Sequence, residues 1–392
     1  MEEWKEYKLG DVSQIKGGKR LPKGVNLITS PNCHPYIRVR DLGTKKTIEL
    51  NTSFEYVDEE TQKSISKYTV EKGDIIISIV GTIGLVAIIG DSLNNANLTE
   101  NCVKIVNSNT LNREYLYYYL ISKFGQDEIK NGTVGAVQAK LPIKNIQDIK
   151  VKAPSLSEQT KIASVLKSLD DKIEVNRRIN DNLEQQAQAL FKSWLSLCKY
   201  EVTIGDLSMN ITDYTKCDQK EVVLINSSDV TEGYFTHHNL SKNENLKGHF
   251  KKRFTKGDIL YSQVRPRNRH WGYCTFDAEN YLASTQLMVI RNKKDIVPSI
   301  LLYQYLIDEN VWVDFTLKTE TRSGTFPQGN YEDLSSIKVP FGADVNDISI
   351  KLKSLYALLF YNEDESRRLA QLRDTLLPRL MSGELKVEDV TL

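Results

Sequence analysis

The sequence predicts an α+β protein made of two duplicated modules, each a mixed, mostly β domain followed by a long helix. Three features predict this fold: short motifs that recur in one order, β-branched and aromatic runs early in each copy, and heptad patterns late in each copy. We expect the two helices to pair as an antiparallel coiled coil with pseudo-two-fold symmetry. The predicted boundaries are 1–155 and 199–341 for the mixed domains, 156–198 for the first helix, and 342–392 for the second helix and tail.

The duplication is indicated by four short matches that keep their order along the chain. Their spacing varies only between 184 residues (72 to 256) and 195 residues (9 to 204). Each match alone is weak, but four at nearly one offset indicate a repeated unit of roughly 190 residues. The matches pair 9–12 with 204–207, 72–75 with 256–259, 149–151 with 337–339, and 167–169 with 353–355.

The first part of each copy has the composition of short buried strands. Residues 74–80 and 286–290 are rich in Ile, Val, Leu and Met, which is typical of buried strands. The repeated Lys-Gly-Asp at 72–74 and 256–258 predicts a turn before a strand, since Gly permits the backbone that such a turn needs. One helix per copy is expected, over 113–124 and 298–308, with Pro298 in the first turn.

The second part of each copy predicts a long helix. Gly and Pro are absent from Ser157 to about residue 195, a length of roughly 58 Å at 1.5 Å per residue. In both copies, positions spaced by seven residues read Ile, Leu, Asn, Leu, Leu, and an apolar series of this period is typical of a coiled-coil seam. The seam residues are Ile162, Leu169, Asn176, Leu183, Leu190 and Ile348, Leu355, Asn362, Leu369, Leu376.

The central asparagine of each seam indicates how the helices pair. A polar residue in a coiled-coil core lowers stability but fixes register and partner. An antiparallel pair reverses the order of layers, so only the middle layer meets its own counterpart. Asn176 is therefore predicted to face Asn362. The alternative is that each asparagine marks a solvated kink.

Composition limits the classes of protein that this chain can belong to. The chain has 392 residues, 40% of them hydrophobic and 26% charged, with a net charge of +1. No apolar run of eighteen or more residues occurs, so we expect no membrane span, and the polar start predicts no signal peptide. Five scattered cysteines and five histidines lack the spacing of a zinc site. We expect a cytoplasmic protein that holds no metal, and any DNA-binding surface must come from local charge.

Several motifs together resemble the specificity subunits of type I restriction-modification systems. The motifs span nearly the whole chain, although the second copy lacks the Pro-x-x-x-Glu-Gln pattern found at the start of the first helix. They are 154–159 (PSLSEQ) with the helix residues 162–173, the C-terminal 376–385 (LLPRLMSGEL), and the domain segments 35–42 (PYIRVRDL) and 72–78 (KGDIIIS).

The resemblance implies a non-catalytic subunit that reads double-stranded DNA. Each mixed domain would then be a target-recognition domain for one half of a split site. The helices would set the distance between the domains and dock two methyltransferase subunits, with restriction subunits joining in a full complex. S-adenosylmethionine, ATP and Mg would be used by these partners, and this chain would hold no cofactor. The alternative is an orphan specificity subunit, or a coiled-coil interaction scaffold, that serves a methyltransferase without restriction.

Motifs of the enzymes themselves are missing from the sequence. Adenine methylation needs an Asn/Asp-Pro-Pro-aromatic motif, and no Pro-Pro occurs. A G-x-x-x-x-G-K-S/T phosphate loop is also absent, which excludes a nucleoside triphosphatase of that kind. Asp148-Ile149-Lys150 and Glu384-Leu385-Lys386 match only the second half of a metal-dependent nuclease motif. We therefore predict no catalytic residue.

In the second domain, the densest candidate for DNA contact is the arginine-rich segment 265–272. Its three arginines alternate, so an extended segment would place them on one face at a loop tip. Arginine and amide side chains read base edges, and lysines suit phosphates. A solvated charged loop is the alternative. The candidates here are Lys251, Lys252, Arg265, Arg267, Asn268 and Arg269.

In the first domain, the segment corresponding to the arginines is the nearly uncharged 80–84, which could contact DNA through its backbone or Thr82. The two domains should therefore read different half-sites. Basic candidates are Lys19 and Arg20, and the pair Arg38 and Arg40, which would share one face of a strand or else form surface ion pairs. Before the last strand of each domain lie further candidates with turn roles as alternatives: Thr133, Gln138 and Lys140 in the first, and Thr325 and Gln328 in the second.

Overall fold

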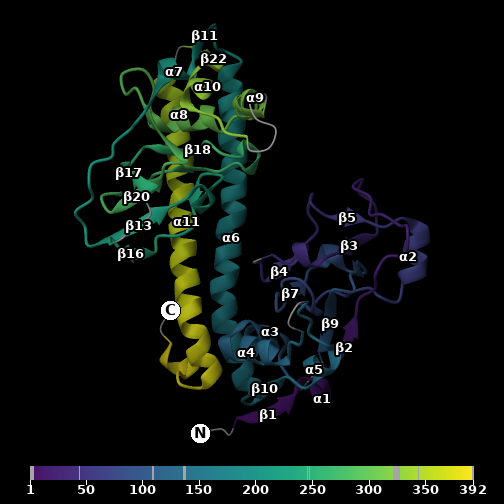
Figure 1. Ribbon diagram of the computed structural model, residues 1–392. Helices are drawn as coiled ribbons and strands as arrows, with labels where there is room; N and C mark the ends of the chain where they lie inside the picture. The colour runs from purple at the N-terminus through teal and green to yellow at the C-terminus, as the bar shows by residue number, and fades with distance from the viewer. Residues whose placement is uncertain are drawn as a thin grey trace. The chain divides into compact units, whose positions relative to one another are not determined.

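A similar order of strands and helices recurs in two halves of the chain in the computed structural model (Figure 1). The structure describes residues 4–43, 45–107, 110–135, 138–244, 246, 248–320, 327–342 and 344–390. The chain forms two units: Met1–Val175 with Glu365–Leu392, and Asn176–Asp364. Each unit therefore contains one mixed domain and half of each long helix. In the described part of the chain, no helix is long and apolar enough to cross a membrane.

The first unit is built on two small sheets. A five-stranded sheet has the order β2-β9-β6-β7-β4, and a three-stranded sheet has the order β5-β3-β8. The strands are β2 Ser13–Gly17, β3 Pro35–Ile37, β4 Thr47–Ile48, β5 Glu55–Tyr56, β6 Ile75–Ser78, β7 Val86–Ile89, β8 Asn97–Leu98 and β9 Cys102–Asn107. The helices are α1 Leu9–Val12, α2 Glu59–Ile65, α3 Arg113–Ile121, α4 Lys123–Gly132 and α5 Ile143–Gln147, with short 3-10 turns η1 Val39–Asp41 and η2 Asp91–Leu93. Terminal strands β1 Lys5–Lys8 and β10 Lys150–Ala153 pair antiparallel.

The second unit repeats this plan. Its sheets have the orders β12-β21-β18-β19 and β16-β13-β20-β17, with the small pair β14-β15 added. The strands are β12 Ser208–Asn210, β13 Glu221–Ile225, β14 Val230–Thr231, β15 Tyr234–Phe235, β16 Leu240–Lys242, β17 Phe250–Lys252, β18 Ile259–Ser262, β19 Trp271–Tyr273, β20 Tyr281–Ser284 and β21 Leu287–Asn292. The helices are α7 Ile204–Leu207, α8 Ser299–Leu306, α9 Glu309–Glu320 and α10 Tyr331–Ser335, with η3 Ser227–Asp229 and η4 Pro266–Asn268. The outer ladder joins β11 Tyr200–Thr203 to β22 Lys338–Phe341.

The repeated Lys-Gly-Asp turns have the same local chemistry in both units. Gly73 and Gly257 have φ of +88° and +91°, a backbone that glycine adopts without a steric penalty. Asp74 accepts a backbone N–H and pairs with Lys104 of β9 at 3.1 Å. Asp258 likewise accepts a backbone N–H and pairs with Arg291 of β21 at 2.6 Å. The sequence repeat therefore marks a turn that is fixed to the neighbouring strand.

The prediction of one helix per mixed domain is wrong. The chain forms α3 and α4 where one helix over 113–124 was expected, because the Ser122 side chain accepts a bond from the Gly125 N–H and starts a new helix. In the second unit α8 is followed directly by α9, which sequence analysis missed. Short helices α5 and α10 precede the last strand of each domain.

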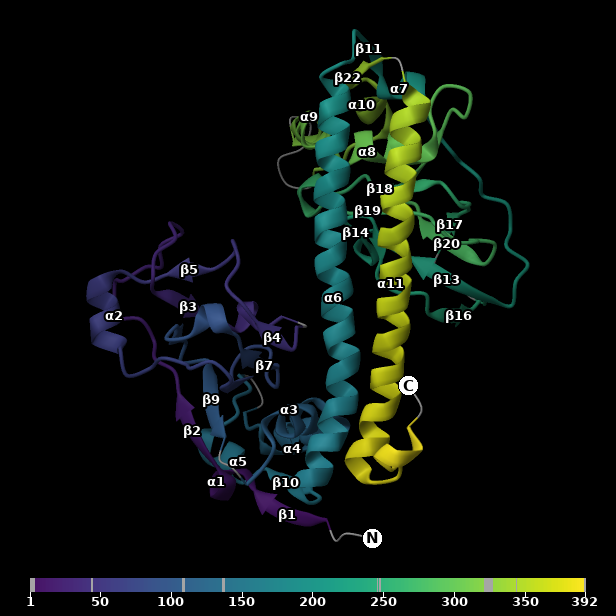
Figure 2. The same cartoon turned by 180° about the vertical axis from the view of Figure 1, so that it is seen from behind.

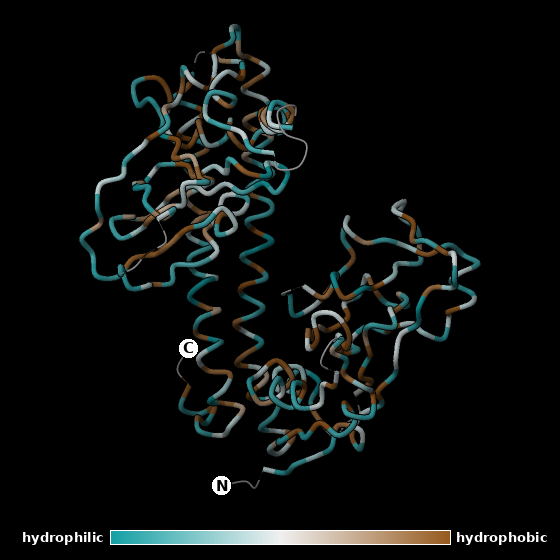
Figure 3. The backbone as a smooth tube through the Cα atoms, viewed as in Figure 1, coloured by the Kyte–Doolittle hydropathy of each residue, from teal (hydrophilic) through white to brown (hydrophobic). Residues whose placement is uncertain are grey.

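The long helices α6 Leu156–Leu195 and α11 Val345–Ser382 each contribute one half to each unit. In the first unit, Lys172 of α6 pairs with Glu365 of α11 at 3.1 Å, and Asp170 pairs with Arg373 at 2.7 Å. Residues near the start of α6 and the end of α11 share that unit's core. In the second unit, the end of α6 and the start of α11 share the core. Figure 2 shows the half-helices side by side in both units, and Figure 3 shows apolar residues recurring along them. The helices thus pair antiparallel, which confirms the predicted fold class.

The middle layer of this helix pair is polar and buried. The Asn176 Nδ2 donates to the Asn362 carbonyl at 3.3 Å, so the two asparagines meet. The Asn362 Nδ2 donates to Asn180 Oδ1 at 2.9 Å, and Asn180 Nδ2 donates to the Leu359 carbonyl at 3.0 Å. Asn180, which sequence analysis did not single out, therefore connects this layer to the backbone of α11. Eight other seam positions are buried or half-buried: Ile162, Leu169, Leu183, Leu190, Ile348, Leu355, Leu369 and Leu376.

Candidate nucleic-acid interface

One edge of a sheet gathers several loops in each unit: the five-stranded sheet in the first, and the sheet β12-β21-β18-β19 in the second. In the first unit, β2 and β6 end where β9 and β7 begin, because the pairs β2–β9, β6–β9 and β6–β7 are all antiparallel. In the second unit, β12, β21, β18 and β19 repeat this arrangement. We call the described loop residues at this edge the edge loops: 18–20, 79–85, 99–101, 133–135 and 138–141 in the first unit, and 211–216, 263–270, 284–286 and 327–329 in the second.

Backbone hydrogen bonds join two predicted DNA-contacting segments within each unit. In the first, the Leu141 N–H donates to the Ile79 carbonyl at 3.0 Å, which places residues 138–141 beside the loop that contains Thr82. In the second, the Arg265 N–H donates to the Pro327 carbonyl at 3.1 Å, and Gly329 N–H donates to Gln263. The structure pairs Val80 with Lys140, and Val264 with Gln328, in corresponding places.

A helix also holds the hairpin loop in both units. The Gln126 Nε2 on α4 donates to the Gly84 carbonyl at 3.0 Å. The Trp312 Nε1 on α9 donates to the Pro266 carbonyl at 2.9 Å. Sequence analysis missed both side chains, because each lies more than 40 residues from the loop that it holds. Only the duplication could have suggested that the helices after the sheets have the same role.

The arginine-rich segment is not extended, so the expectation that its arginines share one face is wrong. Arg265 and Arg269 have φ of +48° and +52°, and residues Pro266–Asn268 between them form the 3-10 turn η4. The loop is nevertheless at the surface, with Arg265, Arg267 and Asn268 exposed. Pro266 is buried and fixes the turn. The tight turn, and not the alternation of an extended strand, therefore sets the direction of each arginine side chain in this loop.

Carboxylates of α9 bind two of these arginines. Arg267 donates from Nε and Nη2 to Glu320, with 2.8 Å for the Nη2 bond. This hydrogen bonding holds the pKa of Glu320 below its usual value. Arg269 donates to both oxygens of Glu309 at 2.8 and 2.9 Å and stacks over the Trp312 ring at 4.1 Å. Arg269 is thus packed against α9, whereas the side chain of Arg267 remains 73% exposed.

Lys252 is not a phosphate contact. Its residue is only 5% exposed, and its Nζ donates to the carbonyls of Leu287 at 2.6 Å and Thr285 at 3.2 Å. Burial lowers the pKa of this ammonium group. Lys251, one position earlier on the strand, is exposed and lies 5.0 Å from the ring centre of Tyr214, next to the edge loops.

The basic candidates of the first unit differ in their surroundings. Lys19 and Arg20 lie in an edge loop, and Arg20 is 81% exposed although it pairs with Glu100 at 2.7 Å. Arg38 is the residue before η1 and Arg40 lies within it, so the expectation that the two arginines share one face of a strand is wrong. Instead both arginines pair with Glu55 and with Asp41. These contacts fit the alternative that the sequence analysis gave for Arg38 and Arg40, namely ion pairs within the domain, because the two carboxylates largely balance the charge of the arginines.

The remaining candidates are polar residues of segments 133–140 and 325–328. Thr133 Oγ1 donates to the Ile129 carbonyl at 2.8 Å and so helps to end α4. This contact fits the structural turn role that was the alternative to DNA contact. Gln138 and Lys140 are exposed, and Gln328 is exposed where it pairs with Val264. Thr325 lies outside the described residues.

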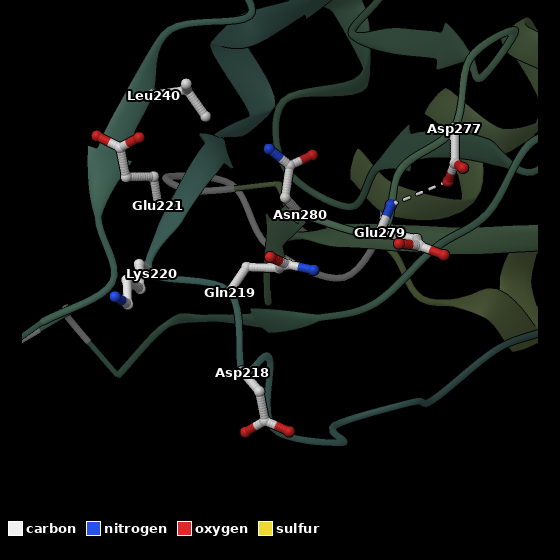
Figure 4. Close-up of a pocket in the computed structure, with 8 residues that line it drawn as sticks. All are labelled: Asp218, Gln219, Lys220, Glu221, Leu240, Asp277, Glu279 and Asn280. Carbon is white, nitrogen blue, oxygen red and sulfur yellow. Dashed lines mark hydrogen bonds between the residues drawn. The ribbon is translucent and has the colours of Figure 1, made fainter.

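A separate pocket of the second unit, about 730 Å³ in volume, is lined mainly by acidic residues, in contrast to the basic candidates for DNA contact (Figure 4). Its lining carries four carboxylates and one ammonium group, from Asp218, Glu221, Asp277, Glu279 and Lys220. The Glu279 N–H donates to Asp277 Oδ1 at 3.2 Å, drawn as a dashed line in Figure 4. Such a surface repels phosphates, so this pocket is not part of the candidate interface. Within the described ranges, no three His, Cys, Asp or Glu residues are grouped as a metal site.

Comparison with known families decides what kind of protein carries this duplicated architecture. The family described as type I restriction modification DNA specificity domain matches residues 1–185 and again residues 201–357. The chain belongs to this family. Its two matches coincide with the two copies recognised from the sequence repeats, and they confirm the resemblance on which the sequence interpretation rested.

Members of the specificity-domain family match different shares of the chain. The HindI specificity subunit of Haemophilus influenzae is 38% identical over 142 residues, which is 36% of this chain and 30% of that subunit. The MjaIX specificity subunit of Methanocaldococcus jannaschii is 23% identical over 99% of this chain and 95% of its own length. The type I restriction-modification S subunit from M. genitalium, a solved structure, aligns with a TM-score of 0.58 and 17% identity, covering 97% of this chain and 96% of that one. The last likeness shows the fold alone.

The specificity-domain motif PSLSEQ has a clear local role in this chain. Gln159 is buried, its Oε1 accepts the Asn112 N–H at 2.8 Å, and its Nε2 donates to the Pro154 carbonyl at 2.9 Å. The motif therefore fastens the start of α6 to the N-cap of α3. The second copy lacks this glutamine, and α11 begins at Val345 after Asp344, whose φ is +64°.

Proposed function

We propose that this chain is the DNA-reading subunit of a type I restriction-modification complex. The edge loops of each unit would contact one half of a bipartite site in double-stranded DNA. One observation supports this most: both units join a hairpin loop to a second loop by backbone hydrogen bonds and fasten it to the following helix. A repeated, rigid loop pair at the edge of a sheet is suited to reading base edges.

The two units would read different sequences. The hairpin loop 80–84 has no charged residue, whereas 264–270 contains three arginines. An arginine favours guanine, while a neutral loop with Thr82 can contact bases only through hydroxyl and backbone groups. The two half-sites should therefore differ, which follows from the loop chemistry and not from the shared fold.

We further propose that the paired helices dock two methyltransferase subunits, with restriction subunits completing the complex. Large apolar side chains remain exposed on the helices in both units: Leu156, Val175 and Leu372 in the first, and Ile179, Ile350, Leu358 and Tyr361 in the second. Such residues on a surface helix are suited to a partner helix. The partners would supply the sites for S-adenosylmethionine, ATP and Mg, and this chain would hold none of them.

Methylation mapping tests the proposed function. We would express the full chain with a type I methyltransferase subunit from the same host and sequence N6-methyladenine in the host genome. The expected result is one asymmetric bipartite motif with a fixed gap, which disappears when this chain is omitted. Methylation without sequence preference, or a motif that persists without the chain, would contradict the proposal. ATP-dependent cleavage of unmodified sites then separates a restriction complex from an orphan specificity subunit.

The purified chain alone should transfer no methyl group and cleave no DNA. The reason is chemical: the sequence lacks the Asn/Asp-Pro-Pro-aromatic motif and the phosphate-binding loop. The measurement is transfer of a labelled methyl group from S-adenosylmethionine to DNA, with the co-expressed complex as the positive control. Label incorporated into DNA by the chain alone would show that a catalytic site exists within it.

A further inference from the structure

We propose that Arg267 reads a guanine in the half-site of the second unit, and that Glu320 is its positioning residue. This inference rests on the proposed function and deepens it by assigning one base contact. Arg267 lies at the exposed turn η4, and Glu320 lies at the end of α9, 53 residues further along the chain. The pair therefore exists only because the fold brings the loop and the helix together.

The geometry of the ion pair leaves the correct edge of the guanidinium available. Glu320 accepts from Nε and Nη2, which is the side edge of the fork. Among the described residues, Nη1 has no acceptor, so the end edge formed by Nη1 and the second Nη2 hydrogen can still donate. That edge fits the O6 and N7 atoms of guanine, the commonest specific contact of arginine with DNA. The 73% exposure of the side chain allows a base to approach.

The carboxylate restricts the orientation of a long and otherwise mobile side chain. Arginine loses rotamer freedom when it binds, and a partner that holds the fork beforehand reduces that loss. The loop itself is held by the Trp312–Pro266 hydrogen bond, by the stacking of Arg269 over Trp312 and by the Arg269–Glu309 pair. Arg267 thus projects from a fixed backbone with a fixed fork direction.

Arg269 does not fit the reading role. Its guanidinium is packed on the Trp312 ring and bonded to Glu309, and its side chain is 34% exposed. Two arginines two residues apart therefore have different functions, one bracing the loop and one facing outward. This division distinguishes the inference from a general statement that the loop is basic.

The experiment is selection of a randomised double-stranded DNA library by the full chain, with sequencing of the bound duplexes. Three proteins are compared with the wild type: Arg267→Lys, Glu320→Gln, and the control Asp347→Asn. The control removes one carboxylate from another exposed ion pair, Asp347–Lys351 on α11, so the change in charge is matched. Thermal melting of each variant checks that it is folded.

In the wild type we expect one guanine position in one half-site. Arg267→Lys should reduce the preference at that position about tenfold to a hundredfold and leave the other positions unchanged. Glu320→Gln should reduce the same preference by about threefold or more, without weakening binding to unrelated DNA, because a loss of positioning affects only that base. Asp347→Asn should match the wild type.

Other results identify which statement fails. A wild type without any sequence preference would contradict the proposed function itself. A specific wild type whose guanine preference survives in Arg267→Lys, or a variant that loses affinity for all sequences alike, would show that Arg267 is not the reader. Loss of the preference in Arg267→Lys but not in Glu320→Gln would overturn the positioning role of Glu320.

Discussion

Lys251 and Lys252 are neighbours in sequence with opposite environments. Lys251 is exposed beside Tyr214, whereas the Lys252 ammonium group is buried and donates to the carbonyls of Thr285 and Leu287. Alternation along strand β17 places one side chain outside and the next inside. A basic residue in this protein can therefore be a structural hydrogen-bond donor.

This difference predicts separable effects of two substitutions. Lys252→Met keeps most of the side-chain volume but leaves the buried Leu287 carbonyl and the half-buried Thr285 carbonyl without this donor, so we expect a loss of about 1–3 kcal/mol in the free energy of unfolding. Lys251→Met is the matched control and should change stability by less than about 0.5 kcal/mol. Denaturant unfolding of both variants checks this. Equal stability of the two would contradict the structural role of Lys252.

The same pair also separates stability from DNA binding. If Lys251 contacts a phosphate, Lys251→Met should weaken binding to all sequences and reduce the slope of log affinity against log salt by about one. Folded Lys252→Met should keep the wild-type slope, because its ammonium group is buried. If the salt slope changed for Lys252→Met and not for Lys251→Met, then Lys252 would be the phosphate contact, and the assignment to Lys251 would be wrong.

Among the elements, the long helices could be predicted from the sequence and the loops could not. The absence of Gly and Pro together with the heptad pattern predicted α6, and the heptad layers predicted the meeting of Asn176 with Asn362, because seam burial depends on spacing along one helix. The arginine loop depends on partners far along the chain: Glu309, Trp312 and Glu320. Sequence periodicity has no information on such contacts, so an extended segment was expected where a 3-10 turn forms.

The polar layer of the helix pair is the element whose energetics can be tested most directly. Asn180→Ala removes the acceptor of the Asn362 Nδ2 and the donor to the Leu359 carbonyl, both in a buried layer. We expect it to destabilise the protein by about 1–3 kcal/mol, because buried polar groups lose their partners. Asn182→Ala, at an exposed position two residues away, is the control and should cost less than about 0.5 kcal/mol. Denaturant unfolding measures both. An Asn180→Ala variant as stable as its control would show that this layer adds no stability.

At the scale of the whole molecule, the two units are joined by continuous helices. α6 has 40 residues and passes from the first unit into the second without interruption, a length of about 60 Å. α11 passes in the opposite order from the second unit into the first. If each unit reads one half-site, the length of these helices should determine the number of unspecified base pairs between the halves.

Insertion of one helical turn tests this relation. Four residues added after Asn176 lengthen α6 by about one turn, or 5.4 Å. Four more added after Asn362 lengthen α11 equally. Within each unit, the half of α6 and the half of α11 can then keep their existing packing layers. One base pair occupies about 3.4 Å of the DNA axis, so the gap should grow by one or two base pairs. Both half-site sequences should stay unchanged, because the edge loops are untouched.

Methylation mapping of the co-expressed complex measures the gap directly. The control is insertion after Asn176 alone, which shifts one half of α6 against the half of α11 that it packs on. That control should melt at a lower temperature than the paired insertion, since apolar layers of one unit then lose their partners. A folded paired-insertion variant that still methylates the original spacing would show that the helices do not set the gap, and the distance would then have to be fixed by contacts with the methyltransferase subunits.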